Sequence, residues 1–149
     1  MRTLVSALSG MFILAACGGS TTTTVTSAPS PTPAINFTMT TQNASGVSGT
    51  GQVVKTAGSF TVTIKLTGLA PSSSHISHIH MGACAAPGGV AYALQQVVAD
   101  SSGAATVTST VQVDYSVPAT GWYVNVHHGP DFSAPANGPS VSCGDLPTA

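Results

Sequence analysis

Short runs of alternating polar and apolar residues limit most strongly what this chain can fold into. In "SFTVTIKL", residues 59–66, every second residue is large and apolar, and the residues between are mostly Thr or Lys. Because successive side chains of a strand point to opposite faces, this spacing predicts a strand with one buried face. Four further runs have strand character, the second of them weakened by glycine: residues 35–41, 46–54, 105–113 and 121–128.

Turn residues separate these runs. Glycine and proline occur between the runs at Ala57-Gly58, Ala70-Pro71, Pro87-Gly88-Gly89, 101–103 and 118–121. The segment "YALQQVVAD", residues 92–100, is interpreted as one more strand. Short strands at this spacing predict an all-β domain, an antiparallel sandwich or barrel.

The first sixteen residues predict an export signal. Met1-Arg2 gives a positive start, and the apolar run from Leu4 to Ala16 is too short for a membrane span. The run ends in "LAAC", which resembles the lipobox of bacterial lipoproteins. That resemblance implies cleavage before Cys17, lipidation of Cys17 and a membrane-anchored protein in the cell envelope, facing the periplasm or the exterior. The alternative is an ordinary signal peptide that leaves Cys17 free.

A linker is expected after the signal. Residues 17–34 are rich in Ser, Thr and Pro and have few large apolar groups, so they cannot offset the entropy of ordering. We expect a flexible tether over 17–34 and a folded domain over 35–149.

Charge is scarce, which excludes one class of partner. Without Arg2 the chain has two lysines and four aspartates, a formal charge of −2. Nucleic-acid binding needs clustered Lys and Arg to neutralise phosphates, so no nucleic-acid partner is expected.

Two cysteines remain if Cys17 carries lipid. In an exported protein Cys84 and Cys143 can form a disulfide, whose loop of about 58 intervening residues would stabilise the fold by about 4 kcal/mol. The alternative is two free thiols.

Three of the five histidines fall in "HISHIHMGAC", residues 75–84. On a strand, His78 and His80 share a face and lie about 6.6 Å apart along it. Ile79 points to the other face, and His75 has the parity of Ile79, so it is expected to face elsewhere. The serines beside His75 are interpreted as turn residues.

The other two histidines are adjacent in "VNVHHG". His127 lies opposite the core-facing Val124 and Val126, which is the orientation of the first pair. His128 has the core parity but stands at the strand end, where it can turn to solvent or act as an alternative ligand. If the two strands are neighbours, three imidazoles converge on one metal ion, and imidazole suits copper and zinc. The alternative is ordinary structural histidines.

Three segments together, "HISHIHMGAC", "GWYVNVHHG" and "GPSVSCGDL", resemble the CHRD domain of bacterial exported proteins, which is similar to Cu/Zn superoxide dismutase. The resemblance implies a Greek-key β-sandwich and copper bound by His78, His80 and His127, with His128 and His75 less favoured. It also implies a disulfide between Cys84 and Cys143.

The departures from the dismutase pattern limit the chemistry that the resemblance implies. The dismutases have a bridging histidine and a zinc-binding loop, but residues 85–103 contain no histidine, so no zinc site is found. Where they have an arginine three residues before the second cysteine, this chain has Ser140. We therefore expect copper handling or weak superoxide defence, with little turnover. The alternative is a non-catalytic envelope module with a vestigial metal site.

Overall fold

The alternating runs form strands in the computed structural model, which describes residues 32–148. The predicted signal peptide, Cys17 and most of the predicted linker lie outside the described residues. Ten strands follow one another: β1 (Ala34–Thr41), β2 (Ser48–Thr56), β3 (Ser59–Thr67), β4 (Ser74–His75), β5 (Ser77–Ala83), β6 (Ala86–Ala93), β7 (Val97–Val98), β8 (Ala105–Val111), β9 (Trp122–His127) and β10 (Ser140–Asp145). A 3-10 turn, η1 (Pro135–Asn137), precedes β10. Over residues 32–148, no helix has the length and apolarity needed to cross a membrane.

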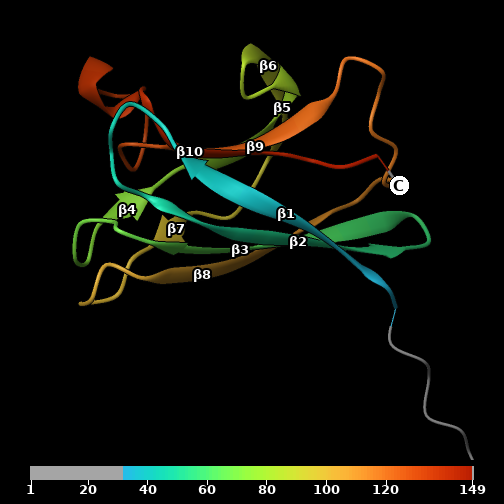
Figure 1. Cartoon of the computed structure of the whole chain (residues 1–149), viewed down its shortest axis with the longest axis horizontal. Coiled ribbons are helices and arrows are strands. Elements are labelled where there is room, and N and C mark those ends of the chain that lie inside the picture. Colours follow the sequence, from blue (N-terminus) through green and yellow to red (C-terminus); the bar gives the residue numbers. More distant parts are fainter. Residues whose placement is uncertain (1–31, 149) are drawn as a thin grey trace, which may run out of the picture. The chain divides into compact units, whose positions relative to one another are not determined.

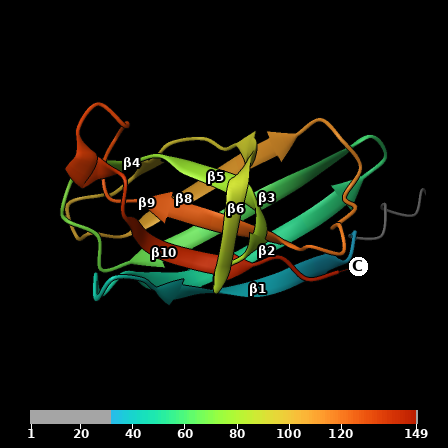
Figure 2. The same cartoon turned by 90° about the horizontal axis from the view of Figure 1, so that it is seen from above.

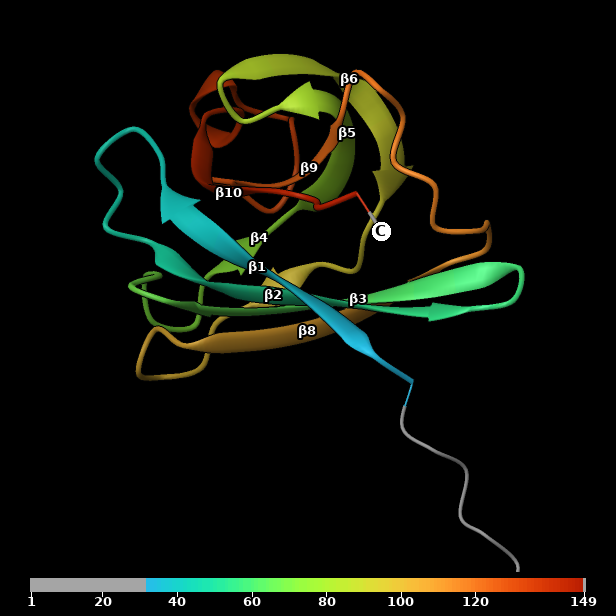
Figure 3. The ribbon, with the colours of Figure 1, turned by 45° about the vertical axis from the view of Figure 1, so that its right-hand side comes forward.

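The main sheet curls into two layers that are continuous at one edge. Its strand order is β6-β5-β9-β10-β1-β2-β3-β8, and every neighbouring pair is antiparallel. Figures 1 and 3 show β2, β3 and β8 in one layer and β5, β6, β9 and β10 in the other. β1 joins them, because Ala34–Met39 pair with β2 while Thr40 and Thr41 pair with β10. The last strand, β10, lies beside the first, β1, and this antiparallel two-layered sheet confirms the predicted fold class.

The core lies between the two layers. The side chains of β3 that were predicted to be buried are at most 2% exposed: Phe60, Val62, Ile64 and Leu66. The opposite layer contributes fully buried Ile79, Val124 and Val126. Strand parity, read from the sequence, therefore identifies the inward face of both layers. Figure 2, seen from above, shows the strands of the two layers crossing at an angle, as twisted sheets do.

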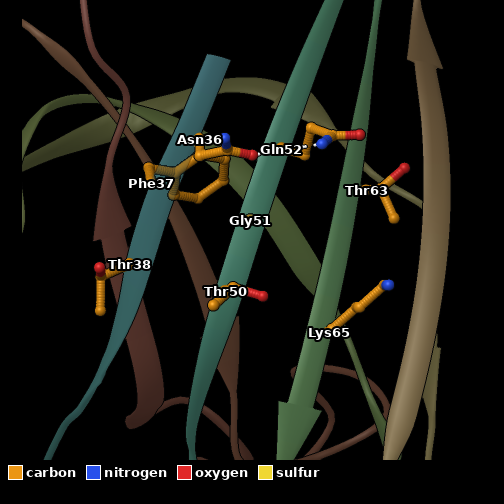
Figure 4. A pocket seen from close by; sticks show the side chains of 8 residues that line it. All are labelled: Asn36, Phe37, Thr38, Thr50, Gly51, Gln52, Thr63 and Lys65. Carbon is orange, nitrogen blue, oxygen red and sulfur yellow. Dashed lines mark hydrogen bonds between the residues drawn. The ribbon is translucent and has the colours of Figure 1, made fainter. Parts of the chain in front are cut away.

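The outer face of β1, β2 and β3 is polar and contains a shallow hollow (Figure 4). Thr50, Gln52 and Thr63 point outward around it, whereas the ring of Phe37 lies across Gly51. A Cβ atom at Gly51 would collide with that ring. Gly51, one of the glycines that lower the strand propensity of this segment, therefore leaves the space into which the ring of Phe37 packs.

Two expectations about the segment after β5 are wrong. Pro87-Gly88-Gly89 was predicted to be a turn, but it lies inside β6, and the hairpin turns at Cys84 and Ala85. Gly88 is needed because β6 approaches β5 too closely for a side chain, at a bulge in the pairing.

Residues 92–100 do not form one strand either. Residues 92 and 93 belong to β6 and residues 97 and 98 to β7, whereas residues 94–96 and 99–100 are irregular. Side-chain hydroxyls replace the ladder there: Ser77 Oγ donates to Gln95 O, and Gln95 N donates to Ser109 Oγ. This arrangement lets the chain leave one layer for the other without leaving its backbone groups unpaired.

A disulfide joins the β5–β6 turn to β10. Cys84 and Cys143 are bonded, with their Cα atoms 6.0 Å apart. The predicted pairing is confirmed, and the alternative of two free thiols is wrong. Asp145 Oδ1 also accepts a hydrogen bond from Cys84 N at 2.7 Å, so the turn is held to β10 at two points.

Candidate metal centre

The pairing of β5 with β9 brings together histidines that are distant in sequence. His78 lies opposite Asn125 and His80 opposite Tyr123, while His127 ends β9 one step further along the same face. The ring centroids are 5.7 Å apart for His78 and His80, 5.5 Å for His78 and His127, and 5.8 Å for His80 and His127. One nitrogen from each ring lies within 4.8 Å of the other two.

Two backbone carbonyls fix the orientation and tautomer of two rings. His80 Nδ1 donates to Gly88 O at 3.0 Å, and His127 Nδ1 donates to Gly138 O at 2.6 Å. Since a carbonyl oxygen only accepts, both Nδ1 atoms carry the proton in the neutral rings. The lone pairs of the two rings are therefore on Nε2, which is how a carbonyl prepares a histidine to bind a metal.

The remaining ring nitrogens include two buried atoms with no hydrogen-bond partner within residues 32–148. They are His78 Nδ1 and His80 Nε2. A buried polar atom left unpaired costs about 1–3 kcal/mol, so such atoms need an explanation. A metal ion between them supplies one.

The spacing of the nitrogens fits a metal ion. Three atoms within 4.8 Å of one another share a point no more than about 2.8 Å from each, and zinc-type bonds to imidazole are about 2.0–2.1 Å. Side-chain movements of less than about an ångström would close that difference. His78, His80 and His127 therefore fit a three-imidazole metal site.

Burial favours the neutral form of two of these rings, because it lowers the pKa of His78 and of His127. For His78, the charges that His127 and His80 would carry lower the pKa further. For His127, the hydrogen bond to Gly138 opposes the lowering of the pKa by burial, and His80 adds to it. A neutral imidazole is the form that binds metals.

His75 and His128 lie apart from the trio. His75 is buried, with Nδ1 donating to His127 O at 2.9 Å and Nε2 2.7 Å from Ser73 Oγ. His128 is exposed at the end of β9. Both line a separate hollow together with Leu69 and Val141. His75 thus braces the backbone that carries His127 without offering the trio a ligand.

A buried amide beside the trio was not foreseen from the sequence. Asn125 is 7% exposed, and its Nδ2 lies 3.3 Å from His127 Nε2. Ser140 Oγ donates to Asn125 Oδ1 and so orients this amide. The signal was present in the parity of β9, on which Asn125 and His127 share a face.

Two aromatic rings also border the trio. Tyr123 stacks on His80, with centroids 5.1 Å apart and planes 27° from parallel. Phe132 contacts His78 and His127 from the loop after β9. Met81 points away from the trio, and its Sδ accepts a hydrogen bond from Trp122 Nε1 at 3.2 Å.

Fold and site together define an all-β protein with a largely buried histidine trio of the kind that binds metals. The CHRD domain matches residues 22–130, and the chain therefore belongs to the CHRD domain family. No curated protein sequence matches the chain.

Solved structures with the same fold include a SOD-like protein from Bacillus subtilis and the Cu/Zn superoxide dismutase from Brucella abortus. The first is 15% identical, with a TM-score of 0.59, and covers 75% of this chain and 97% of its own. The second is 16% identical, with a TM-score of 0.58, and covers 77% of this chain and 100% of its own. At such identities the likeness establishes the fold alone.

Proposed function

We propose that this protein is an exported, lipid-anchored CHRD domain that binds copper through His78, His80 and His127, for copper handling or weak defence against superoxide. The anchor would be Cys17, and the domain would face the periplasm or the exterior. One observation carries the metal-binding part: one nitrogen from each of the three rings converges with the others. The trio also has two buried ring nitrogens without a partner within residues 32–148.

Copper is favoured on chemical grounds. Among first-row divalent ions Cu²⁺ binds nitrogen sites most tightly, and imidazole is one of its usual ligands. The dismutase from Brucella abortus, named as a Cu/Zn enzyme, shares the fold. A bound copper ion would supply one-electron redox chemistry, while the chain's own residues hold it and limit what reaches it.

Fast turnover is not supported. Attraction of an anion needs positive potential near the metal. Both lysines of the described residues, Lys55 and Lys65, lie on β2 and β3, in the layer opposite the histidines. Ser140 is neutral and hydrogen-bonded to Asn125. Superoxide would therefore reach the site without electrostatic steering, which favours copper handling over dismutation.

The hydrogen bond of Asn125 favours a second function, that of a non-catalytic envelope module. The amide of Asn125 is within hydrogen-bond distance of His127 Nε2 at 3.3 Å, so part of the trio is satisfied without an ion. A non-catalytic envelope module with a vestigial metal site would have such an arrangement.

Copper titration separates the two functions. The full-length chain, purified in a mild detergent, is loaded with Cu(II), and its stoichiometry and affinity are measured against a competing chelator. We expect one tightly held ion, lost in the variant with His78→Ala, His80→Ala and His127→Ala and retained in His128→Ala, which removes an exposed histidine outside the trio. Equal binding by the triple variant would leave the vestigial module as the better account.

A superoxide assay on the loaded protein then tests turnover, which we expect to be near that of free copper.

Lipid anchoring needs its own test. Cells expressing the chain are fractionated, and a Cys17→Ala variant is compared with the parent. We expect the parent in the membrane fraction and the variant in the soluble or secreted fraction. If the parent and Cys17→Ala are found in the same fraction, Cys17 carries no anchor.

A further inference from the structure

Phe132 is an exposed aromatic ring held against the histidine trio. It is 57% exposed, so burial in the core does not explain its position. Its ring lies nearly parallel to that of His78, at 12° with centroids 5.9 Å apart. It meets His127 edge to face, at 80° and 5.0 Å. One ring therefore contacts two of the three proposed ligands.

The loop that carries Phe132 is fastened on both sides of it. Asp131 Oδ1 accepts hydrogen bonds from Ser133 N at 2.8 Å, from Ser133 Oγ at 2.6 Å and from Asn137 Nδ2 at 3.2 Å. Gly129 N also donates to Asn137 O at 3.2 Å. The same connection from β9 to η1 and β10 carries the Gly138 carbonyl that orients His127 (Figure 1). The position of the ring is thus set by the loop that completes the metal site.

The place that Phe132 occupies is the more open side of the trio. His80 and His127 are 9% and 6% exposed, and Tyr123 lies against His80. His78 is the one member of the trio that is half-buried, and Phe132 stacks on it. Water or an anion approaching the trio past His78 therefore meets this ring.

We propose that Phe132 caps the metal site, so that the three histidines hold Cu(I) in preference to Cu(II) and small anions are kept from the ion. This inference rests on the proposed function. Cu(II) favours four or more nitrogen and oxygen ligands in a tetragonal arrangement, which three imidazoles complete only with water or an anion. A cap withholds that ligand from Cu(II) but costs a three-coordinate Cu(I) complex nothing.

Two variants test the cap, and neither changes a ligand. Phe132→Ala removes the ring, and Asp131→Ala releases the loop but keeps the ring. Because Phe132 and Asp131 are exposed, both variants are expected to fold, which the near-ultraviolet circular dichroism spectrum checks. Val98→Ala, which trims another exposed apolar side chain on β7, is the matched control.

Two binding measurements are made on the full-length chain. Azide is titrated into the Cu(II)-loaded protein and followed by its charge-transfer absorption and by electron paramagnetic resonance. Cu(I) and Cu(II) affinities are measured separately with competing chelators. In Phe132→Ala we expect azide to bind more tightly and the ratio of Cu(I) to Cu(II) affinity to fall, each by about three-fold or more, because Cu(II) can then take a further ligand. Asp131→Ala should shift both in the same direction, and Val98→Ala should shift neither.

Failure of the cap and failure of the site give different results. If the triple histidine variant loses copper but Phe132→Ala matches the parent in azide affinity and in the Cu(I)-to-Cu(II) ratio, the cap is refuted and the metal site stands. If the triple variant binds copper as the parent does, the proposed function has failed, and the cap fails with it.

Discussion

The Nδ1 atom of His80 donates a hydrogen bond to the carbonyl oxygen of Gly88, 3.0 Å away on the neighbouring strand. The bond links a proposed ligand to the hairpin β5–β6, which is bulged at this point. It also fixes which nitrogen of His80 is free to bind a metal. Copper binding is therefore expected to depend on Gly88, which contributes only its backbone carbonyl.

Replacing Gly88 by alanine tests that dependence. A Cβ atom there would lie 2.5 Å from Met81 O, so the strands would have to move apart. We expect Gly88→Ala to lower the free energy of unfolding by about 1–3 kcal/mol, as overpacking does, and to weaken copper binding. Gly89→Ala is the control, because nothing lies within 4 Å of a Cβ at Gly89. Urea denaturation and chelator competition measure the two effects, and equal behaviour of the two variants would contradict the role given to Gly88.

Asn125 is expected to matter for the fold more than for the metal. Asn125→Leu removes the amide that pairs with both Ser140 Oγ and His127 Nε2. Buried partners left unpaired cost about 1–3 kcal/mol, so the metal-free protein should be less stable by that amount. Copper would take the place of the amide at His127, so the copper affinity should change less than about three-fold.

The control for this prediction is Asn36→Leu, because Asn36 lies on the exposed outer face of β1, where its Oδ1 accepts a hydrogen bond from Gln52 Nε2. Thermal unfolding with and without copper gives both quantities. A large loss of copper affinity in Asn125→Leu alone would mean that the amide positions a ligand and does not merely substitute for one.

Strand parity accounts for how much of this molecule can be predicted from its sequence. The period-two pattern placed Phe60 and Ile64 in the core and put His78 and His80 on one face, because parity is a local property of the backbone. It could not show that β5 and β9 are neighbours, since strand pairing depends on contacts between residues far apart in sequence. The resemblance to CHRD domains suggested that pairing.

Two features could not be predicted from the local sequence. The first is the role of a glycine, which can serve either a turn or the close approach of two strands. Pro87-Gly88-Gly89 reads as a turn, but the glycine serves close approach of two strands, which a sequence does not distinguish from a positive φ. The sequence does not mark Phe132, because an isolated aromatic residue in a polar loop has no periodic pattern. Its contacts with His78 and His127 depend on how residues 129–137 fold back toward the end of β9.

Reduction of the disulfide should destabilise the domain considerably. Cys84 and Cys143 are 59 residues apart, and a bridge closing such a loop contributes about 2–5 kcal/mol. We expect the urea midpoint of the parent to fall when a reductant is added, as its free energy of unfolding drops by that amount. The double variant Cys84→Ala, Cys143→Ala should start at the lower midpoint and be insensitive to reductant. A change below about 1 kcal/mol in the parent would show that the Asp145 bond and the strand pairing already hold the turn.

Alkaline pH should weaken the fold through Tyr115. Burial raises the pKa of Tyr115 to about 12, and its hydroxyl donates to Pro147 O at 2.6 Å. An unfolded tyrosine ionises near pH 10, so between about pH 10 and about pH 12 the unfolded chain has released a proton that the folded chain keeps. The contribution of Tyr115 to the free energy of unfolding is therefore fully present below about pH 10 and is lost as the pH rises toward 12. The free energy of unfolding, followed from about pH 8 to about pH 11, should fall more gently in Tyr115→Phe, which has no proton to release. Parallel curves for the parent and this variant would show that Tyr115 ionises as readily in the folded domain as in the unfolded chain.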